Sequence, residues 1–469
     1  MSTSSRLRPN CLNFSQLLAQ NIALISPTMT AALIVPVMYS NTGDWSWLSY
    51  ALGTVMLLFV AYNLNQFASR STTSGSMYAY TCRGLGLTAG GISGWALIWA
   101  YLGISMAGVT GFSIFADTLL GMMGLHVPFI VLFAVCVLIG GYCAWKDVRV
   151  SLLLTLILEG LSVSFILLLC FIVLFQHHFT LDTPQFTVSA LPWSSVGLGV
   201  VVAIFSLVGF ESATAFGDEA KNPLKTIPRS VSVSLLLAGA FFVFVTYVEV
   251  MGTRGYSTTL DQIDAPLNVL AQLASVPLLQ IPLSIGAMVS FFALCMSCLN
   301  AGGRVIYAMG RHGLFHASTA YSHETNETPH IAVILMSLLA FSVPSAMILG
   351  GVAPLDAFND VGTCAAFGFI VAYGLVTLAA PVYLKRLGEM KGSHVFGCVA
   401  ALILLAIPAV GSVYPIPDPP VKYFPYGFLV YMAIGIIWIM SVYRRRPKAM
   451  EVVQADLERS HARYKDAHA

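Results

Sequence analysis

The sequence predicts an all-α integral membrane protein with about twelve membrane-spanning helices. Of its 469 residues, 57% are hydrophobic and only 9% are charged, and the mean hydropathy is +0.80. A soluble domain carries about 25% charged residues, so this composition excludes an ordinary soluble domain. Apolar runs of about 20 residues, the length that crosses a bilayer as a helix, recur along the whole chain.

These runs define the expected spans, with an error of about 2–4 residues at each bound. The spans are Asn21–Val37, Trp47–Ala68, Gly90–Leu120, Pro128–Trp145, Ser151–Phe175, Ser195–Phe216, Ser230–Met251, Ile281–Met309, Ile331–Gly350, Gly362–Leu384, Val395–Val413 and Tyr426–Tyr443.

The positions of Lys and Arg predict the orientation, because cytoplasmic loops of membrane proteins are enriched in these residues. With the N-terminus in the cytoplasm, only Arg254 and Lys422 of the 23 basic residues lie outside. The residues expected inside are Arg6, Arg8, Arg70, Arg83, Lys146, Arg149, Lys221, Lys225, Arg229, Arg304, Arg311, Lys385, Arg386, Lys391, Arg444, Arg445, Arg446, Lys448, Arg459, Arg463 and Lys465. We therefore expect a multi-pass protein of the plasma (inner) membrane with both termini cytoplasmic.

The first span is interrupted at its middle by polar residues and a proline. Pro27 removes a backbone donor and frees a carbonyl one turn earlier. Ser26, Thr28 and Thr30 can bond to the backbone and compete with the helix. An open backbone in lipid is tolerated only where protein or a cavity surrounds it, so we expect a functional break; a simple proline kink is the alternative.

The sixth span contains a second interruption, at Gly209 and Glu211. A carboxylate at the centre of a spanning helix costs about 2.5–3.5 kcal/mol on insertion scales. Such residues usually face a protein interior or a wet cavity, so Glu211 is a functional candidate. The alternative is a glycine kink with a glutamate that a neighbouring helix satisfies.

The two interruptions lie five helices apart, which is the spacing of two five-helix repeats in inverted orientation. In that arrangement, half-helix N-termini bind an anion and open carbonyls bind a cation, which suits the two groups of an α-amino acid. The expected divisions are a cytoplasmic N-terminus (1–20), a first repeat (21–175), a second repeat (195–384), two further helices (395–443) and a cytoplasmic tail (444–469).

Three motifs resemble the amino acid–polyamine–organocation (APC) superfamily of transporters. The first motif lies around the second break and consists of Gly209-Phe210-Glu211-Ser212, Glu219-Ala220-Lys221-Asn222-Pro223 and Ile227-Pro228-Arg229. The second lies before and in the third span and consists of Gly75-Ser76-Met77-Tyr78-Ala79-Tyr80, Arg83-Gly84-Leu85-Gly86, Gly94-Trp95-Ala96 and Tyr101. The third lies at the end of the eighth span and runs from Asn300 to Gly313. Their order covers most of the first ten spans. The resemblance implies the LeuT-like 5+5 fold and secondary transport of a small molecule, and a short helix in the loop 252–280.

The resemblance also implies a substrate site between the two breaks. Amides of the first break would bind a carboxylate and carbonyls of the second would bind an amine, with Phe205 or Phe210 as gates. The implied substrate-binding residues are Ser26, Thr28, Met29, Thr30, Ala31, Phe205, Ser206, Val208, Gly209 and Phe210.

The chain departs from the family pattern in three places. Residues 29–33, Met-Thr-Ala-Ala-Leu, replace the usual Gly-Ser-Gly-Ile-Phe, so side chains narrow the first break. Thr72 and Ser76 replace a proline and a glycine of the loop before the third span. Ser162 stands where some proton-coupled relatives carry a lysine.

Two carboxylates and one serine are the candidates for coupling or gating. Burial away from water favours the protonated form of a carboxylate, so we expect Glu159 in the fifth span to carry or gate a proton. The alternative is a glutamate that reaches the cytoplasmic mouth near Lys146 or Arg149. Ser162 is expected either to pack or to help bind Na⁺. We expect Glu211 to hold the unwound backbone, with proton carriage as the alternative.

These observations predict a transporter of amino acids, coupled to H⁺ by analogy, with Na⁺ coupling or exchange left open. The expected site has no charged side chain clearly aimed at a second charge, which favours a neutral amino acid; a polyamine or organic amine is the alternative. A non-transporting amino acid sensor and a channel are rivals from other classes. We expect no enzyme activity, cofactor, metal or nucleic acid partner, and we interpret Cys295 and Cys298 as packing residues.

We also expect Glu249 and Asp117, near the outer ends of their spans, to lie at the membrane interface.

Overall fold

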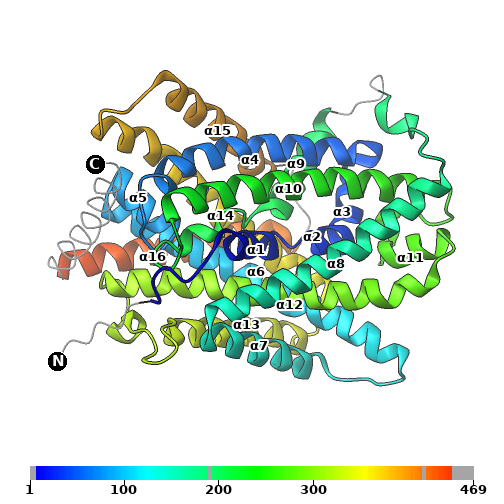
Figure 1. The fold of residues 1–469 in the computed structure, drawn as a ribbon, viewed down its shortest axis with the longest axis horizontal. Coiled ribbons are helices and arrows are strands. Elements are labelled where there is room, and N and C mark those ends of the chain that lie inside the picture. Colours follow the sequence, from blue (N-terminus) through cyan, green and yellow to red (C-terminus); the bar gives the residue numbers. More distant parts are fainter. Residues whose placement is uncertain (1–6, 188–192, 264, 415–418, 446–469) are drawn as a thin grey trace.

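The computed structural model describes residues 7–187, 193–263, 265–414 and 419–445, and it leaves side chains 193 and 194 undescribed. Almost all of these residues are helical, and the pairing of extended backbone is limited, within these ranges, to two isolated bridges. Long helices run side by side along the long axis of the molecule (Figure 1). The all-α prediction is therefore confirmed.

The helices occur in the following order. They are α1 (Phe14–Ile25), α2 (Pro27–Met29), the π-helix η1 (Thr30–Ile34), α3 (Val35–Thr42), η2 (Gly43–Trp45), α4 (Ser46–Ala68), α5 (Met77–Leu85), α6 (Leu87–Met122), α7 (Phe129–Lys146), α8 (Val148–Gln176), η3 (Thr183–Phe186), α9 (Trp193–Leu207), η5 (Ser212–Ala215), α10 (Pro223–Gly252), η6 (Leu260–Gln262), α11 (Pro266–Leu273), η7 (Pro277–Leu279), α12 (Gln280–Arg311), η8 (Ala317–Ala320), α13 (His330–Leu349), α14 (Pro354–Arg386), α15 (Gly392–Gly411), η9 (Val421–Tyr423) and α16 (Phe424–Arg445).

Ten helical stretches of the described chain are long and apolar enough to cross a membrane. One of them, Phe14–Ala68, has 55 residues and contains the first two expected spans. The expected sixth span appears as the shorter apolar helix Ser195–Leu207, because the chain leaves helical geometry before residue 209. These two differences account for the gap between ten stretches and the twelve expected spans.

Several helices are longer than their apolar runs predict. The first begins at Phe14, because Asn13 and Gln16 form a reciprocal capping box before the apolar run starts. Helices α10 and α14 begin seven and eight residues before the expected spans, each with proline in its first turn. Proline is suited to that position because its missing N–H has no partner there. Hydropathy marks the apolar middle of a helix and not its polar ends.

Helix α6 lies at the centre of the bundle and packs against α12 and α14. Glycines allow this close approach. A Cβ atom at Gly108 would lie 2.8 Å from the backbone nitrogen of Cys295, and one at Gly368 would lie 2.4 Å from the Ala96 carbonyl oxygen. Small residues let spanning helices approach closely where the hydrophobic effect gives no drive for association.

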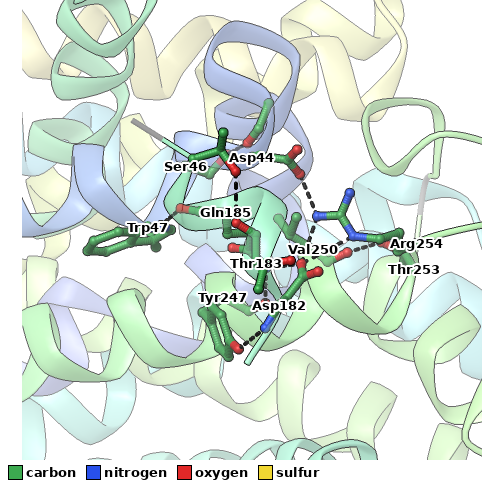
Figure 2. A network of polar contacts seen from close by, with 12 residues as sticks. Asp44, Ser46, Trp47, Asp182, Thr183, Gln185, Tyr247, Val250, Thr253 and Arg254 are labelled. Carbon is green, nitrogen blue, oxygen red and sulfur yellow. Dashed lines mark hydrogen bonds and ion pairs between the residues drawn. The ribbon is translucent and has the colours of Figure 1, made fainter. Parts of the chain in front are cut away.

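Ion pairs lie at both ends of the molecule. At one end, which we call the N-terminal end, Arg8 pairs with Asp147 and Glu327. At the other, the Arg254 guanidinium bonds the carboxylates of Asp44 and Asp182, each at 2.7 Å (Figure 2). The expected cytoplasmic residue Arg6 and the tail beyond Arg445 lie outside the described residues.

We expect Gly108→Val to destabilise the bundle by about 1–3 kcal/mol, since the added side chain meets the α12 backbone, which has no free rotamer to move into. Thermal unfolding of the purified protein in detergent measures the effect. Gly160→Val is the matched control, because a Cβ atom at Gly160 meets nothing within 4 Å. Equal melting temperatures for the two variants would contradict this account of the packing.

Candidate functional site

The first predicted break is a real interruption of the helix. Helix α1 ends at Ile25, and Ser26 adopts a left-handed conformation with φ +50°. Pro27 has no N–H to donate to the carbonyl one turn earlier. After one short turn the backbone widens to a π-helix, in which the Val35 N–H bonds the Thr30 carbonyl. A π-turn is rare and frequently marks a functional site.

The second predicted break lies directly against the first. Helix α9 ends at Leu207, and Gly209 has φ +99°, a conformation that favours glycine. A Cβ atom at Gly209 would lie 2.0 Å from Cδ2 of Leu24, two residues before Ser26. Only a glycine therefore fits where the two interrupted helices meet.

Glu211 lies at the centre of the second break and is fully buried. The Tyr373 hydroxyl donates to its Oε2 atom at 2.6 Å and the Tyr101 hydroxyl to its Oε1 atom at 3.1 Å. The backbone N–H of Gly209 also donates to Oε2, at 3.1 Å. This carboxylate thus ties the unwound backbone to α6 and α14.

Asn21 of α1 satisfies the next part of the unwound chain. Its Oδ1 atom accepts hydrogen bonds from the Ala213 backbone N–H at 2.7 Å and from the Ser212 hydroxyl at 3.1 Å. Its Nδ2 atom donates to Ser234 of α10 at 3.2 Å. Our reading of the sequence missed this residue. The rule that drew attention to Glu211, a polar side chain inside an apolar span, applies equally to Asn21.

Glu159 joins the first break to two other helices. Ser290 of α12 donates to its Oε2 atom, and the Thr28 hydroxyl donates to its Oε1 atom at 3.4 Å. Thr28 is also hydrogen-bonded to Ser162 at 2.7 Å, and Ser26 to Ser290 at 3.2 Å. These five side chains, all buried, form the Glu159 network.

The alternative that Glu159 reaches the cytoplasmic mouth near Lys146 or Arg149 is wrong, because this residue is only 3% exposed. The two cations proposed for that contact have other partners. Arg149 lies 3.8 Å from a carboxylate oxygen of Asp147, and Lys146 donates to the Tyr142 hydroxyl.

The other predicted site residues are brought close to the two breaks. Met29, Thr30, Ala31, Ser206, Val208 and Phe210 are buried, and Phe205 is partly exposed. Tyr50 is hydrogen-bonded to Ser206 at 3.2 Å, and the ring of Phe210 packs against Tyr373. The Thr30 hydroxyl has no hydrogen-bond partner within the described part of the chain.

At the N-terminal end of the molecule, a buried ion pair joins α12 to the segment after the second break. Arg304 donates from Nη2 to Oε1 of Glu219 at 2.8 Å and from Nε to Oε2, and both side chains are fully buried. The Arg304 guanidinium also lies 4.0 Å from the ring centroid of Phe216. A bidentate pair of this kind fixes both the distance and the orientation of its partners.

The segment before α1 also contacts Glu219. The backbone N–H groups of Cys11 and Leu12 donate to the Glu219 carbonyl at 2.8 and 3.0 Å, and the Lys221 N–H donates to the Leu12 carbonyl at 2.7 Å. We call residues 11–12 the N-terminal strap. Burial, assisted by the charge of Glu219, raises the pKa of the Cys11 thiol to about 11, so this cysteine is protonated and unreactive at neutral pH.

Ser76, one of the departures from the family pattern, keeps the backbone geometry of a glycine. It has φ +56°, and its hydroxyl is hydrogen-bonded to Thr214 of η5 at 2.7 Å. Ser76 therefore connects the loop before α5 to the segment that follows the second break. The sequence did not lead us to expect that Ser76 contacts the segment after the second break.

A family model for amino acid permeases matches residues 16–451. The chain belongs to the amino acid permease family. It is 25% identical over 431 residues to the branched-chain amino acid permease BcaP of Bacillus subtilis, and the match covers 87% of each chain. It is 24% identical to BcaP of Lactococcus lactis, over 89% of this permease and 93% of the relative.

Other relatives differ in their named substrates. The low-affinity putrescine importer PlaP of Escherichia coli is 22% identical over 71% of this permease and 72% of its own length. Among solved structures, a mutant of the Eremococcus coleocola manganese transporter matches with a TM-score of 0.60 at 12% identity, over 98% of this permease and 99% of that chain. The second likeness concerns the fold alone, and it agrees with the predicted 5+5 architecture.

Three expectations are now settled. The superfamily predicted from the motifs is confirmed, as is the helical bundle with interrupted first and sixth spans. The expectation that Glu249 lies at the membrane interface is wrong, because its side chain is fully buried within the protein. Position along a span does not reveal which face of the helix a side chain occupies.

We expect Asn21→Ala to destabilise the permease by about 1–3 kcal/mol, because the Ala213 N–H loses its acceptor inside the protein. Thermal unfolding in detergent measures the loss. Asn41→Ala is the control, since Asn41 is partly exposed and donates to a carbonyl of its own helix. If both variants melted like the wild-type protein, Asn21 would not be holding the second break.

Proposed function

We propose that this chain is a secondary active transporter that carries neutral amino acids across the plasma membrane by alternating access. One observation carries the proposal: two interrupted helices meet inside the bundle, with Gly209 against Leu24. An α-amino acid has a carboxylate and an ammonium group on one carbon atom. Open N–H groups of one break and open carbonyls of the other are complementary to that pair.

The first break binds the carboxylate and the second binds the amine in this proposal. The unpaired, buried hydroxyl of Thr30 supports the first assignment, because it is free to donate to a ligand. The bend at Gly209 supports the second, since it turns backbone carbonyls out of the helical ladder. Ser26, Thr28, Met29 and Ala31 complete the first side, and Phe205, Ser206, Val208 and Phe210 complete the second.

The engagement of Glu211 favours a neutral substrate over a polyamine. Both of its oxygen atoms already accept hydrogen bonds, from Tyr101, Tyr373 and the Gly209 N–H. Three of its roughly four acceptor sites are thus occupied, so little of this carboxylate remains for a second ammonium group. The two branched-chain amino acid permeases among the relatives support the same choice, and the putrescine importer is the reason to test it.

Glu159 is the group that we assign to proton coupling. Its ionised carboxylate accepts hydrogen bonds from Thr28 of the first break and from Ser290 of α12. A proton converts one of these acceptor oxygens into a donor, so the network must rearrange. Because the network ends at Ser26 and Thr28, protonation acts directly on the conformation of the first break.

We place the N-terminal end of the molecule in the cytoplasm, as the distribution of basic residues predicts. The Arg304–Glu219 pair then closes the cytoplasmic side in this conformation. The short helix α11, present in the loop where the resemblance implies one, then lies on the outer side.

An uptake series from glycine to tryptophan, with putrescine added, tests the substrate class in proteoliposomes. We expect accumulation of small and branched apolar amino acids and reduced uptake of tryptophan, since Met29 and Ala31 narrow the first break. Equal rates for every amino acid would contradict the narrowing. Uptake of putrescine alone would overturn the neutral substrate, and binding without any uptake would favour a sensor.

We expect Glu159→Gln to abolish accumulation driven by a pH gradient while the protein stays folded, because glutamine preserves the shape of the side chain but cannot exchange a proton. Uptake with and without an imposed gradient, in the presence and absence of Na⁺, measures this. Glu324→Gln, in an exposed loop, is the matched control. Full gradient-driven uptake by Glu159→Gln, or strict dependence on Na⁺, would rule out the proposed coupling.

A further inference from the structure

A second buried carboxylate lies outside the Glu159 network. Glu249 of α10 is fully buried, and neither of its carboxylate oxygens has a hydrogen-bond partner within the described residues. The hydroxyl of Thr246, one turn earlier on the same helix, is also fully buried and lacks a partner there. Two neighbouring polar groups left unpaired in one place are unusual, since buried polar groups are nearly always hydrogen-bonded.

The groups around Glu249 offer it no positive charge. Tyr50 of α4 and Cys170 of α8 lie near this carboxyl group, and Phe242, on the same face of α10, packs against the Tyr50 ring with the ring centroids 5.3 Å apart. The neighbouring segments add Tyr39 of α3 and the exposed Asp261 of η6, neither of which is a cation. The sequences of α1, α2, η1, η5, α9 and α11 contain no titratable side chain.

The nearest cation in the sequence, just after the end of α10, is already engaged. Arg254, five residues after Glu249, bonds Asp44 and Asp182, and Figure 2 shows its side chain directed toward these two carboxylates. A carboxylate that is buried without a counter-charge or a hydrogen-bond donor is strongly disfavoured in its ionised form. The neutral carboxylic acid avoids that cost, and it supplies an O–H donor that the ionised form lacks.

We propose that Glu249 is a second proton-binding site of this protein, occupied by a proton in this conformation and separate from Glu159. The site lies about 5 Å along the helix axis from Gly252, the last residue of α10, and is thus close to the end of the molecule that carries Arg254. This inference depends on burial and on missing partners alone. It holds whichever substrate the protein carries.

Tyr50 connects this site to the second break. Its hydroxyl is hydrogen-bonded to Ser206, next to the last residue of α9, and its side chain is near enough to Glu249 to be affected by a charge there. Loss of the proton would place a negative charge beside Tyr50 and make the packing of α4, α9 and α10 less favourable. The conformation seen here is therefore the one that the proton at Glu249 stabilises.

Thermal unfolding of the wild-type protein and of Glu249→Gln, measured in detergent from about pH 5 to about pH 9, tests the proposal. In the unfolded wild-type chain Glu249 is ionised over most of this range, whereas the folded protein retains the proton. The folded state then binds more protons, so wild-type stability falls as the pH rises. Glutamine is neutral at every pH, and the melting temperature of Glu249→Gln should therefore fall less.

The expected result is a difference in melting temperature that is small near pH 5 and shifts steadily in favour of Glu249→Gln toward pH 9. The Glu324→Gln variant, altered in an exposed loop, should follow the wild-type curve throughout. A constant difference between wild type and Glu249→Gln across the range would overturn the proposal. So would stabilisation of the wild-type protein, but not of Glu249→Gln, by added Na⁺ or K⁺, since the site would then bind a metal cation.

Infrared spectroscopy provides a second measurement that does not depend on unfolding. A protonated carboxyl group has a carbonyl absorption well separated from that of a carboxylate. We expect Glu249→Gln to lose one such band at neutral pH, and Glu249→Met, in case glutamine prevents folding, to lose the same band. Retention of the full band in a folded variant would refute the assignment. Neither measurement involves transport, so failure here and failure of the proposed transport function are distinguishable.

Discussion

The constraint on which this structure depends is the need to satisfy backbone groups where helices are broken inside an apolar bundle. Each open N–H or C=O group buried away from water must find a partner or a ligand. Here the Ala213 N–H donates to Asn21 of α1, and the Gly209 N–H donates to Glu211 of the same break, whose carboxylate also accepts from Tyr101 of α6 and Tyr373 of α14. The second break is thereby tied to α1, α6 and α14, which are far from it in the sequence, so a shift of one of these helices changes the hydrogen bonding of the break.

Two carboxylates near the breaks, Glu211 and Glu159, have different hydrogen-bond partners, and these partners suit them to different roles. Glu211 receives three donors, from α6, α14 and the backbone, which suits an anion that stays ionised and holds the chain in place. Glu159 receives two hydroxyl donors, each of which has a further hydroxyl neighbour. A chain of hydroxyl groups can reverse the direction of its hydrogen bonds, because a hydroxyl both donates and accepts. Gain and loss of a proton are therefore compatible with the surroundings of Glu159.

Much of the fold and part of the site could be predicted from the sequence. The breaks were evident because Pro27, Gly209 and Glu211 violate the apolar pattern of spanning helices, and a local violation is visible without a structure. The contact between the breaks, and the burial of Glu249, depend on helix rotation and on partners hundreds of residues away. Hydropathy contains no such information, which is why Asn21 was missed and Glu249 was placed at the interface. The roles of the site residues stay predictions.

The N-terminal strap has a mechanical consequence. Glu219 is held twice, by the Arg304 guanidinium through its side chain and by Cys11 and Leu12 through its carbonyl. Separating a buried ion pair without a replacement costs about 3–5 kcal/mol. The strap, the segment after the second break and α12 all meet at Glu219. If one of them moved away alone, Glu219 would lose part of its hydrogen bonding. Any displacement that separates Arg304 from Glu219 must therefore also disturb the hydrogen bonds of residues 11 and 12, so the side-chain and backbone contacts of Glu219 are mechanically linked.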